Sequence, residues 1–74
     1  MNTNQKNDLN VAIHHLESVM ESLISLNNCL GIMVEDVARN CSDGLNALYD
    51  VAGLNKRYYI EKNEYGEIIR RKVY

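Results

Sequence analysis

The stretch from Leu9 to Cys41 constrains the fold most, because its apolar residues recur with helical spacing and no proline interrupts them. Written as a heptad repeat, the first apolar position is filled by Leu9, Leu16, Leu23, Leu30 and Val37, and the second by Ala12, Val19, Leu26 and Met33. A third row widens the stripe to the breadth expected of a bundle helix: Ile13, Met20, Val34 and Cys41. This pattern predicts one long helix over residues 8–41.

The length of this helix predicts that it needs another chain. At about 1.5 Å per residue it would extend about 50 Å, which the rest of a 74-residue chain is too short to cover. A chain of this size also buries a small core, with a surplus of only a few kcal/mol over conformational entropy. We therefore expect a helical-bundle homodimer of the coiled-coil kind, joined by a seam of Leu9, Ile13, Leu16, Val19, Met20, Leu23, Leu26, Leu30, Met33 and Val37.

The ends of the helices are predicted from capping residues. Residues 1–7 are polar and expected to be disordered, with Asn7 or Asp8 as the N-cap. A glycine inside a helix costs about 1 kcal/mol, but Ile32, Met33 and Val34 are poor N-caps for a new helix, so the helix is predicted to continue through Gly31. The break is placed at residues 40–44 instead, with a short second helix over 43–53 that folds back and ends at Gly53. A single straight helix as far as Leu54 is the alternative.

The C-terminal part changes character. Residues 57–62 and 67–74 contain β-formers such as Tyr59, Ile60 and Ile69, and Gly66 follows a turn-like segment between them. This pattern predicts a β-hairpin over 57–74, which must pack on the helices because an isolated hairpin is marginal in water. The fold class expected for this single domain is therefore mainly α, with a long helix, a short second helix and a C-terminal hairpin.

Charge is distributed unevenly along the chain. Residues 1–54 contain two basic and seven acidic residues, a net charge of −5, whereas residues 55–74 contain six basic and three acidic residues, a net charge of +3. A basic tail rich in tyrosine is typical of single-stranded nucleic-acid binding. It is equally explained by a tail that lies against the acidic helices of its own chain, and this second interpretation is favoured.

No catalytic or metal-binding pattern is present in the sequence. His14 and His15 are adjacent on a helix and point about 100° apart, so they cannot share one metal ion. The thiols of Cys29 and Cys41 have no activating neighbour in sequence, and twelve helical residues separate them too far for a disulfide. We expect a protein that is not an enzyme and holds no cofactor or metal. Without a secretory signal or a membrane-spanning stretch, a cytoplasmic location is expected.

The function expected from these features is a small non-enzymatic protein–protein interaction module, acting as a regulator, adaptor or inhibitor on a homodimeric helical scaffold. In kind, a short proline-free chain resembles the small proteins of phages and mobile elements, although no motif carries this resemblance. The alternatives are a nucleic-acid-binding regulator and a purely structural assembly subunit; no membrane partner is expected. The partner-binding candidates are Ile24, Ile32, Ala38, Arg57, Tyr58, Tyr59, Tyr65, Arg70, Arg71, Lys72 and Tyr74.

Overall fold

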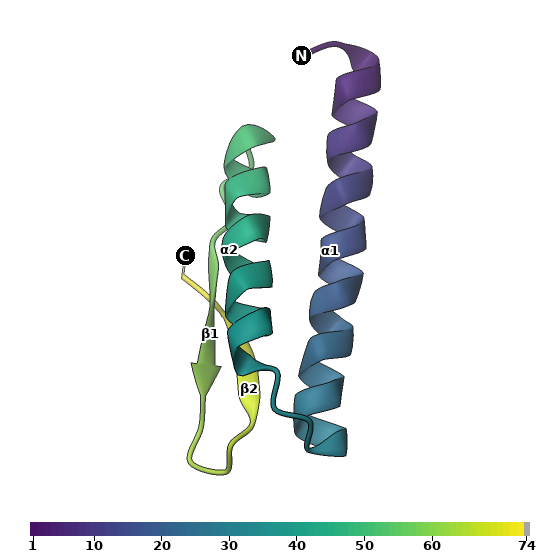
Figure 1. Cartoon of the computed structure of the whole chain (residues 1–74). Helices are drawn as coiled ribbons and strands as arrows, with labels where there is room; N and C mark the ends of the chain where they lie inside the picture. Colours follow the sequence, from purple (N-terminus) through teal and green to yellow (C-terminus); the bar gives the residue numbers. More distant parts are fainter. Residues whose placement is uncertain (74) are drawn as a thin grey trace.

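The computed structural model describes residues 1–73 and consists of two helices followed by a β-hairpin (Figure 1). Helix α1 (Thr3–Leu30) and helix α2 (Glu35–Val51) lie side by side and run in opposite directions. Strands β1 (Tyr58–Lys62) and β2 (Ile68–Lys72) form a two-stranded antiparallel sheet along α2. The expected class, mainly α with a C-terminal hairpin, is confirmed. Tyr74, one of the predicted partner-binding residues, lies outside the described residues.

The start of α1 corrects the prediction that residues 1–7 are disordered. Asn2 and Gln5 form a capping box: Asn2 Oδ1 accepts from the Gln5 amide, and Gln5 Oε1 accepts from the Asn2 amide, both at 2.9 Å. These bonds satisfy backbone donors that the first turn of a helix leaves unpaired. The helix therefore begins at Thr3, several residues before the predicted cap at Asn7 or Asp8.

The prediction that one helix spans residues 8–41 is wrong, because α1 ends at Gly31. Gly31 has φ +68°, in the left-handed region where glycine lacks the steric penalty of other residues. The amides of Gly31 and Ile32 both donate to the carbonyl of Leu26, the latter at 3.0 Å, and so satisfy the end of the helix. Helix α2 then starts without a side-chain cap, and its first turn carries Glu35 and Asp36, which suit the positive end of the helix dipole.

The predicted break at residues 40–44 lies inside α2. The hydroxyl of Ser42 is turned away from a capping role and donates to the Tyr58 carbonyl at 3.3 Å. Gly44 is an interior helical residue, and its φ lies outside the positive range. The predicted end of the second helix near Gly53 is confirmed, because Gly53 has φ +71° and the Leu54 amide donates to the Tyr49 carbonyl at 2.9 Å.

The hairpin forms where the sequence predicted it. Tyr58 pairs with Lys72 at one end of the ladder and Lys62 with Ile68 at the other. The connecting turn is stabilised by Asn63, whose Oδ1 accepts from the amides of Tyr65 and Glu67, and it closes through Gly66 with φ +81°.

The hydrophobic core lies where the inner face of the hairpin meets both helices. The buried apolar residues of the described chain are Ile13, Met20, Leu23, Ala38, Leu45, Tyr49, Ile60 and Ile68. Each element contributes to this set, which explains why the hairpin is stable here although isolated hairpins are not. The core is small, as expected for a chain of 74 residues.

Two asparagines hold the hairpin against the helices through its backbone. Asn28 on α1 donates from Nδ2 to the Ile68 carbonyl and accepts from the Ile68 amide, both at 2.9 Å. Asn46 on α2 makes the same pair of bonds with Tyr58, at 2.8 and 2.9 Å. Tyr58 and Ile68 lie on different strands, so one asparagine occupies the outer edge of each strand.

Candidate interaction surface

The predicted dimer seam is divided by the fold between the interior and the surface. Ile13, Met20 and Leu23 are buried in the core of their own chain, and Leu9, Leu16 and Leu26 are partly buried against it. The exposed members are Val19, Leu30, Met33 and Val37. Much of the seam is therefore covered by α2 and the hairpin, and only the exposed remainder is accessible to a second chain.

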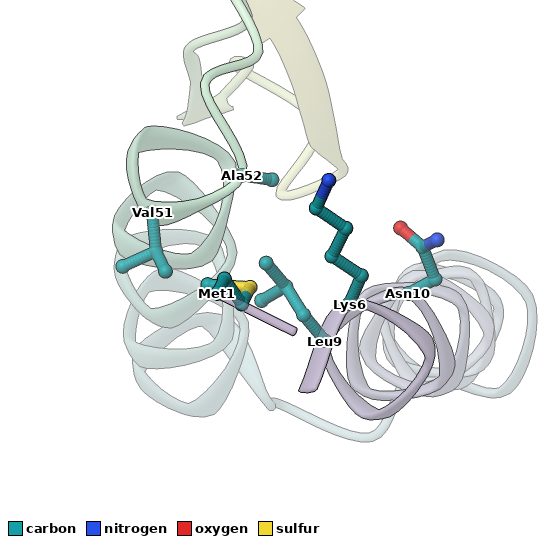
Figure 2. A pocket seen from close by; sticks show the side chains of 6 residues that line it. All are labelled: Met1, Lys6, Leu9, Asn10, Val51 and Ala52. Atoms are coloured by element: carbon teal, nitrogen blue, oxygen red, sulfur yellow. The ribbon is translucent and has the colours of Figure 1, made fainter. Parts of the chain in front are cut away.

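The exposed remainder lies on the side of the helix pair opposite the hairpin. Figure 2 shows the two helices nearly end-on, with the hairpin on one side and, among the described residues, only the helix connection on the other. Hydrogen bonds from Asn28 and Asn46 fix which sides of α1 and α2 face the hairpin. At about 100° per residue, the helical positions turned away from it form one surface. We call this surface the open helical face: Ala12, Val19 and Leu26 of α1 with Val37, Gly44, Leu48 and Val51 of α2.

The open helical face is apolar and carries no charged side chain. The exposed fractions of Val19, Val37 and Val51 are 42%, 54% and 60%. The residues at three- and four-residue steps along the face, from Ala12 to Leu30 and from Val37 to Val51, include no Asp, Glu, Lys or Arg. A shallow hollow on its α1 side is lined by His15, Ser18, Val19, Ser22, Leu23 and Leu26. Isolated exposed valines are common, but a continuous uncharged row on two adjacent helices is a candidate interaction surface.

The end of the helix pair near the N-terminus contains a second hollow. It is lined by Met1, Lys6, Leu9, Asn10, Val51 and Ala52 (Figure 2). Met1 lies between the start of α1 and Val51, whereas the amino group of Lys6 points toward the hairpin side (Figure 2). This end of the helix pair is therefore mixed in character: Met1, Leu9 and Val51 are apolar, whereas Asp8, four residues before Ala12 on the same side of α1, is charged.

Several predicted partner-binding residues support the fold instead. Ala38 is fully buried, so its prediction as a partner-binding residue is wrong. Ile24 is partly buried against the core. Arg70 stacks over the ring of Tyr58 at 3.9 Å from its centroid and donates from Nη2 to the Tyr49 hydroxyl at 2.7 Å. These contacts make the side chains of Tyr58 and Arg70 part of the packing between the hairpin and α2.

The buried hydroxyl of Tyr49 connects three elements. It donates to Glu17 Oε2 on α1 at 2.7 Å while accepting from Arg70 on β2. Burial, followed by the hydrogen bond to the Glu17 carboxylate, raises the pKa of Tyr49. Nε of Arg70 is buried without a hydrogen-bond partner within the described residues. The network therefore orients the hairpin, and no feature of it indicates a reaction.

The remaining predicted candidates lie on the hairpin or its rim and are exposed. Tyr59 and Arg71 are cross-strand partners on the outer surface of the sheet, beside the pair Glu61 and Ile69. We call these four residues the outer hairpin face. Tyr65 in the turn is 79% exposed, and Arg57 and Lys72 are also exposed. Ile32 is exposed too, but it lies in the connection from α1 to α2 and not on the hairpin.

Three of the six basic residues of the tail contact acids of the same chain. Lys62 lies 3.5 Å from Glu35, and Arg57 lies 3.7 Å from Asp50, both acids of α2. Arg71 pairs with Glu61 at 2.7 Å, and this pair raises the pKa of Arg71. The tail cations thus contact acidic residues of the helix and the hairpin, as the favoured interpretation of the charge asymmetry predicted.

The residues that could carry chemistry are the histidines, the cysteines and the acidic residues. No three His, Cys, Asp or Glu side chains in residues 1–73 are grouped closely enough to hold a metal ion. The Cys41 thiol lies 3.6 Å from the Leu16 carbonyl, and burial raises its pKa, which disfavours the thiolate. Within the same residues, no helix has the length and apolar character that crossing a membrane requires.

Comparison of the chain with models of protein families, with curated proteins and with solved structures found no match.

The sequence analysis did not identify Gly44 and Val51 as part of this surface, and it did not identify the asparagine contacts that hold the hairpin. Gly44 and Val51 were assigned to a connection and a short helix, yet they follow Val37 at seven-residue steps on one helix. The same heptad count, applied from residue 35 onward, would have grouped these residues on one side of a helix, although it would not have shown that this side is exposed. The asparagine contacts with the hairpin join residues 12 and 40 positions apart, and no local pattern signals them.

Proposed function

We propose that this protein is a small non-enzymatic protein–protein interaction module, a regulator, adaptor or inhibitor, and that two copies join through the open helical face. The observation that carries the proposal is the uncharged apolar surface that runs along both helices on the side opposite the hairpin. An interface with another protein removes such a surface from water, and a second copy presents the same uncharged surface in return.

The size of the open helical face fits a dimer. Helix α2 has 17 residues and is about 25 Å long, and two adjacent helices are about 20 Å wide, so the face covers about 500 Å². Two copies would bury about 1,000 Å² in total, which is near the lower limit for a specific interface. Because the core within one chain is small, this additional burial would contribute a substantial share of the stability.

The outer hairpin face supplies a separate surface for a partner of another kind. Tyr59 and Arg71 of this face and Tyr65 in the adjacent turn are exposed, and tyrosine and arginine are enriched among residues that dominate binding energies. The asparagine contacts at Tyr58 and Ile68 hold the backbone of this surface in place, which lowers the entropy lost on binding. In the proposed dimer the two outer hairpin faces point away from the joined helices and remain accessible.

The dimer is tested by light scattering on the purified protein at micromolar concentration. Val19→Glu and Val37→Glu each place a carboxylate on the open helical face, and each is expected to shift the particle to the monomer mass. Val73→Glu is the matched control, because Val73 is 50% exposed on the hairpin; this variant is expected to remain dimeric. An unmodified chain that is monomeric at these concentrations would show the dimer proposal to be wrong.

The partner surface is tested by affinity capture with the unmodified chain and with Tyr59→Ala/Arg71→Ala. Loss of a captured protein in the double variant, with the dimer mass unchanged, supports a partner on the outer hairpin face. Equal capture by both proteins argues against this location.

Nucleic-acid binding has less support, because acids of the same chain contact Arg57, Lys62 and Arg71. Titration with labelled single-stranded DNA or RNA at two salt concentrations tests it. Tight binding that falls steeply with salt, and that is lost in Arg70→Ala/Arg71→Ala, would replace the protein-partner proposal.

A further inference from the structure

We propose that two copies stack with α2 of one copy on α1 of the other, which gives a four-helix bundle with antiparallel neighbours throughout. This inference rests on the dimer proposed above and specifies its geometry. Two open helical faces can be stacked by a two-fold axis in two ways with their helices aligned. An axis parallel to the helices places α2 on α1 of the second copy, whereas an axis across them places α2 on α2 and α1 on α1.

The charge beside the open helical face favours the first arrangement. Asp36, Asp43 and Asp50 are exposed on α2 at seven-residue steps, each one residue before Val37, Gly44 or Val51. This acidic row runs along the side of α2 that is turned away from α1. Stacking α2 on α2 would bring two acidic rows together, and opposed like charges disfavour association.

The corresponding side of α1 carries no acid between residues 9 and 30, and its one acid is Asp8 near the N-terminal end. It carries His15, Ser18 and Ser22, which are exposed. Stacking α2 on α1 places the acidic row of each copy beside these residues of the other copy. That arrangement keeps the two acidic rows apart and provides hydroxyl and imidazole donors beside Asp36 and Asp43, while Asp50 keeps its contact with Arg57 of its own chain.

The shape of the two helices favours the same arrangement. Gly44 leaves a gap in the middle of α2, because a Cβ atom built there would meet no other atom within 4 Å. The position of Gly44 along the helix pair follows from the contact between Asn27 Oδ1 and the Val34 amide. Gly44 lies ten residues beyond Val34, and Val19 lies eight residues before Asn27, so the two are level to within about 3 Å. An axis parallel to the helices therefore places Val19 of the second copy opposite the gap.

The arrangement is tested by cross-linking between Ser22 and Asn40, which are both exposed. Ser22 is five residues before Asn27 and Asn40 is six residues beyond Val34, so they are level along the helix pair to about one residue. Within one chain they lie on the sides of α1 and α2 that are turned away from each other. With α2 on α1 of the second copy, they become neighbours between copies.

The experiment uses the full chain with Cys29→Ser and Cys41→Ser. One preparation carries Ser22→Cys and a differently tagged one carries Asn40→Cys; they are mixed, equilibrated and treated with a short bis-maleimide. The expected product is a covalent dimer that contains one chain of each kind. Circular dichroism and light scattering establish beforehand that each variant is folded and dimeric.

The outcomes separate this inference from the proposed function. A dimer in which each position links only to itself would overturn the arrangement and leave the dimer intact. A monomer for every preparation, the unmodified chain included, would remove both. Gly44→Met provides an independent measurement: filling the gap is expected to raise the dimer Kd at least tenfold, whereas Ala47→Met at the edge of the face leaves the Kd within twofold. An unchanged Kd for Gly44→Met would also overturn the arrangement.

Discussion

Asn28 binds both backbone groups of Ile68, donating to the carbonyl and accepting from the amide at 2.9 Å each. The side-chain amide offers a donor and an acceptor side by side, so Asn28 binds both backbone groups of Ile68 at the edge of β2, as a residue of a neighbouring strand would. A carboxylate of the same shape could accept from the Ile68 amide, but it has no hydrogen for the carbonyl. The contribution of each bond can therefore be separated by substitution.

We expect Asn28→Ala to lower the free energy of unfolding by about 1 to 2 kcal/mol, because it leaves the amide and carbonyl of Ile68 partly buried and unpaired. Asn28→Asp should also destabilise, since it removes the donor and places a carboxylate against a carbonyl oxygen. Urea unfolding followed by circular dichroism at fixed protein concentration measures both. Asn10→Ala, at an exposed position of the same helix, is the control and should change stability by less than about 0.5 kcal/mol. Equal effects at Asn10 and Asn28 would refute a special role for Asn28.

Tyr49→Phe should lower the free energy of unfolding by about 1 to 3 kcal/mol, because Glu17 and Arg70 would lose the hydroxyl that they share. The ring is retained, so the effect isolates the hydroxyl group. A double-mutant cycle with Glu17→Gln measures the coupling between the two side chains. A coupling energy near zero would show that the contact at 2.7 Å contributes little to stability.

Gly31→Ala should destabilise the protein by about 1 kcal/mol, because an alanine is strained at φ +68°. Gly31→Asn is the matched control, since asparagine tolerates the left-handed region better than alanine and should cost less. Thermal unfolding of the two variants beside the unmodified chain provides the comparison. If alanine proved as stable as glycine at this position, the end of α1 would have to differ from the one described.

Acidification should weaken the contact between α2 and β1 at Glu35. The hydrogen bond from Arg39 lowers the pKa of Glu35 below its usual value of 4.5. Arg39 also donates from Nη1 to the Ile60 carbonyl at 2.8 Å, so the ion pair orients a side chain that connects α2 to the hairpin. Because the pKa is lower in the folded state, this stabilisation is present above pH 4.5 and is lost as the pH falls through the lower folded-state value.

Glu35→Gln tests this pH dependence. The difference in midpoint temperature between the unmodified chain and Glu35→Gln should be constant from pH 7 to about pH 5 and should shrink below pH 4.5. Glu64→Gln, in the hairpin turn, is the control and should show no such change. A difference that stays constant down to pH 3 would contradict the assignment.

The sequence predicted the elements whose signals are local. Asn63 and Gly66 defined the hairpin turn, and Gly53 correctly marked the end of the second helix. The capping box of Asn2 and Gln5 was an equally local signal, but the polar composition of residues 1–7 was given more weight. In that case the information was present and was interpreted wrongly.

The prediction at Gly31 was wrong because it relied on the start of the second helix and not on the end of the first. The absence of a capping residue at Ile32 to Val34 argued for a continuous helix, yet α2 begins without any side-chain cap. A left-handed glycine ends α1, and two acidic residues lie in the first turn of α2. These two features are sufficient to separate the helices without a side-chain cap. The heptad pattern did not reveal the break, because Val37 continues the first apolar position of the repeat although in α2 it is exposed and Ala38 is buried instead.

The division of the apolar residues between core and surface depended on tertiary structure. Ala38 and Val37 are adjacent and both apolar, yet one is fully buried and the other is 54% exposed. Only the position of the hairpin, held by residues far away in sequence, decides which side of the helix pair is covered. The open helical face could therefore not be located before the fold was known.

The asparagine contacts have a further consequence for solubility. A sheet of two strands has two outer edges, and unpaired edges recruit strands from other molecules into aggregates. Asn46 and Arg39 bind backbone groups of Tyr58 and Ile60 on β1, and Asn28 binds those of Ile68 on β2, so the helices occupy part of each edge. A chain whose hairpin detached from the helices would expose those edges together with Ile60 and Ile68. The same contacts that fix the hairpin thereby protect the folded protein from fibrous self-association.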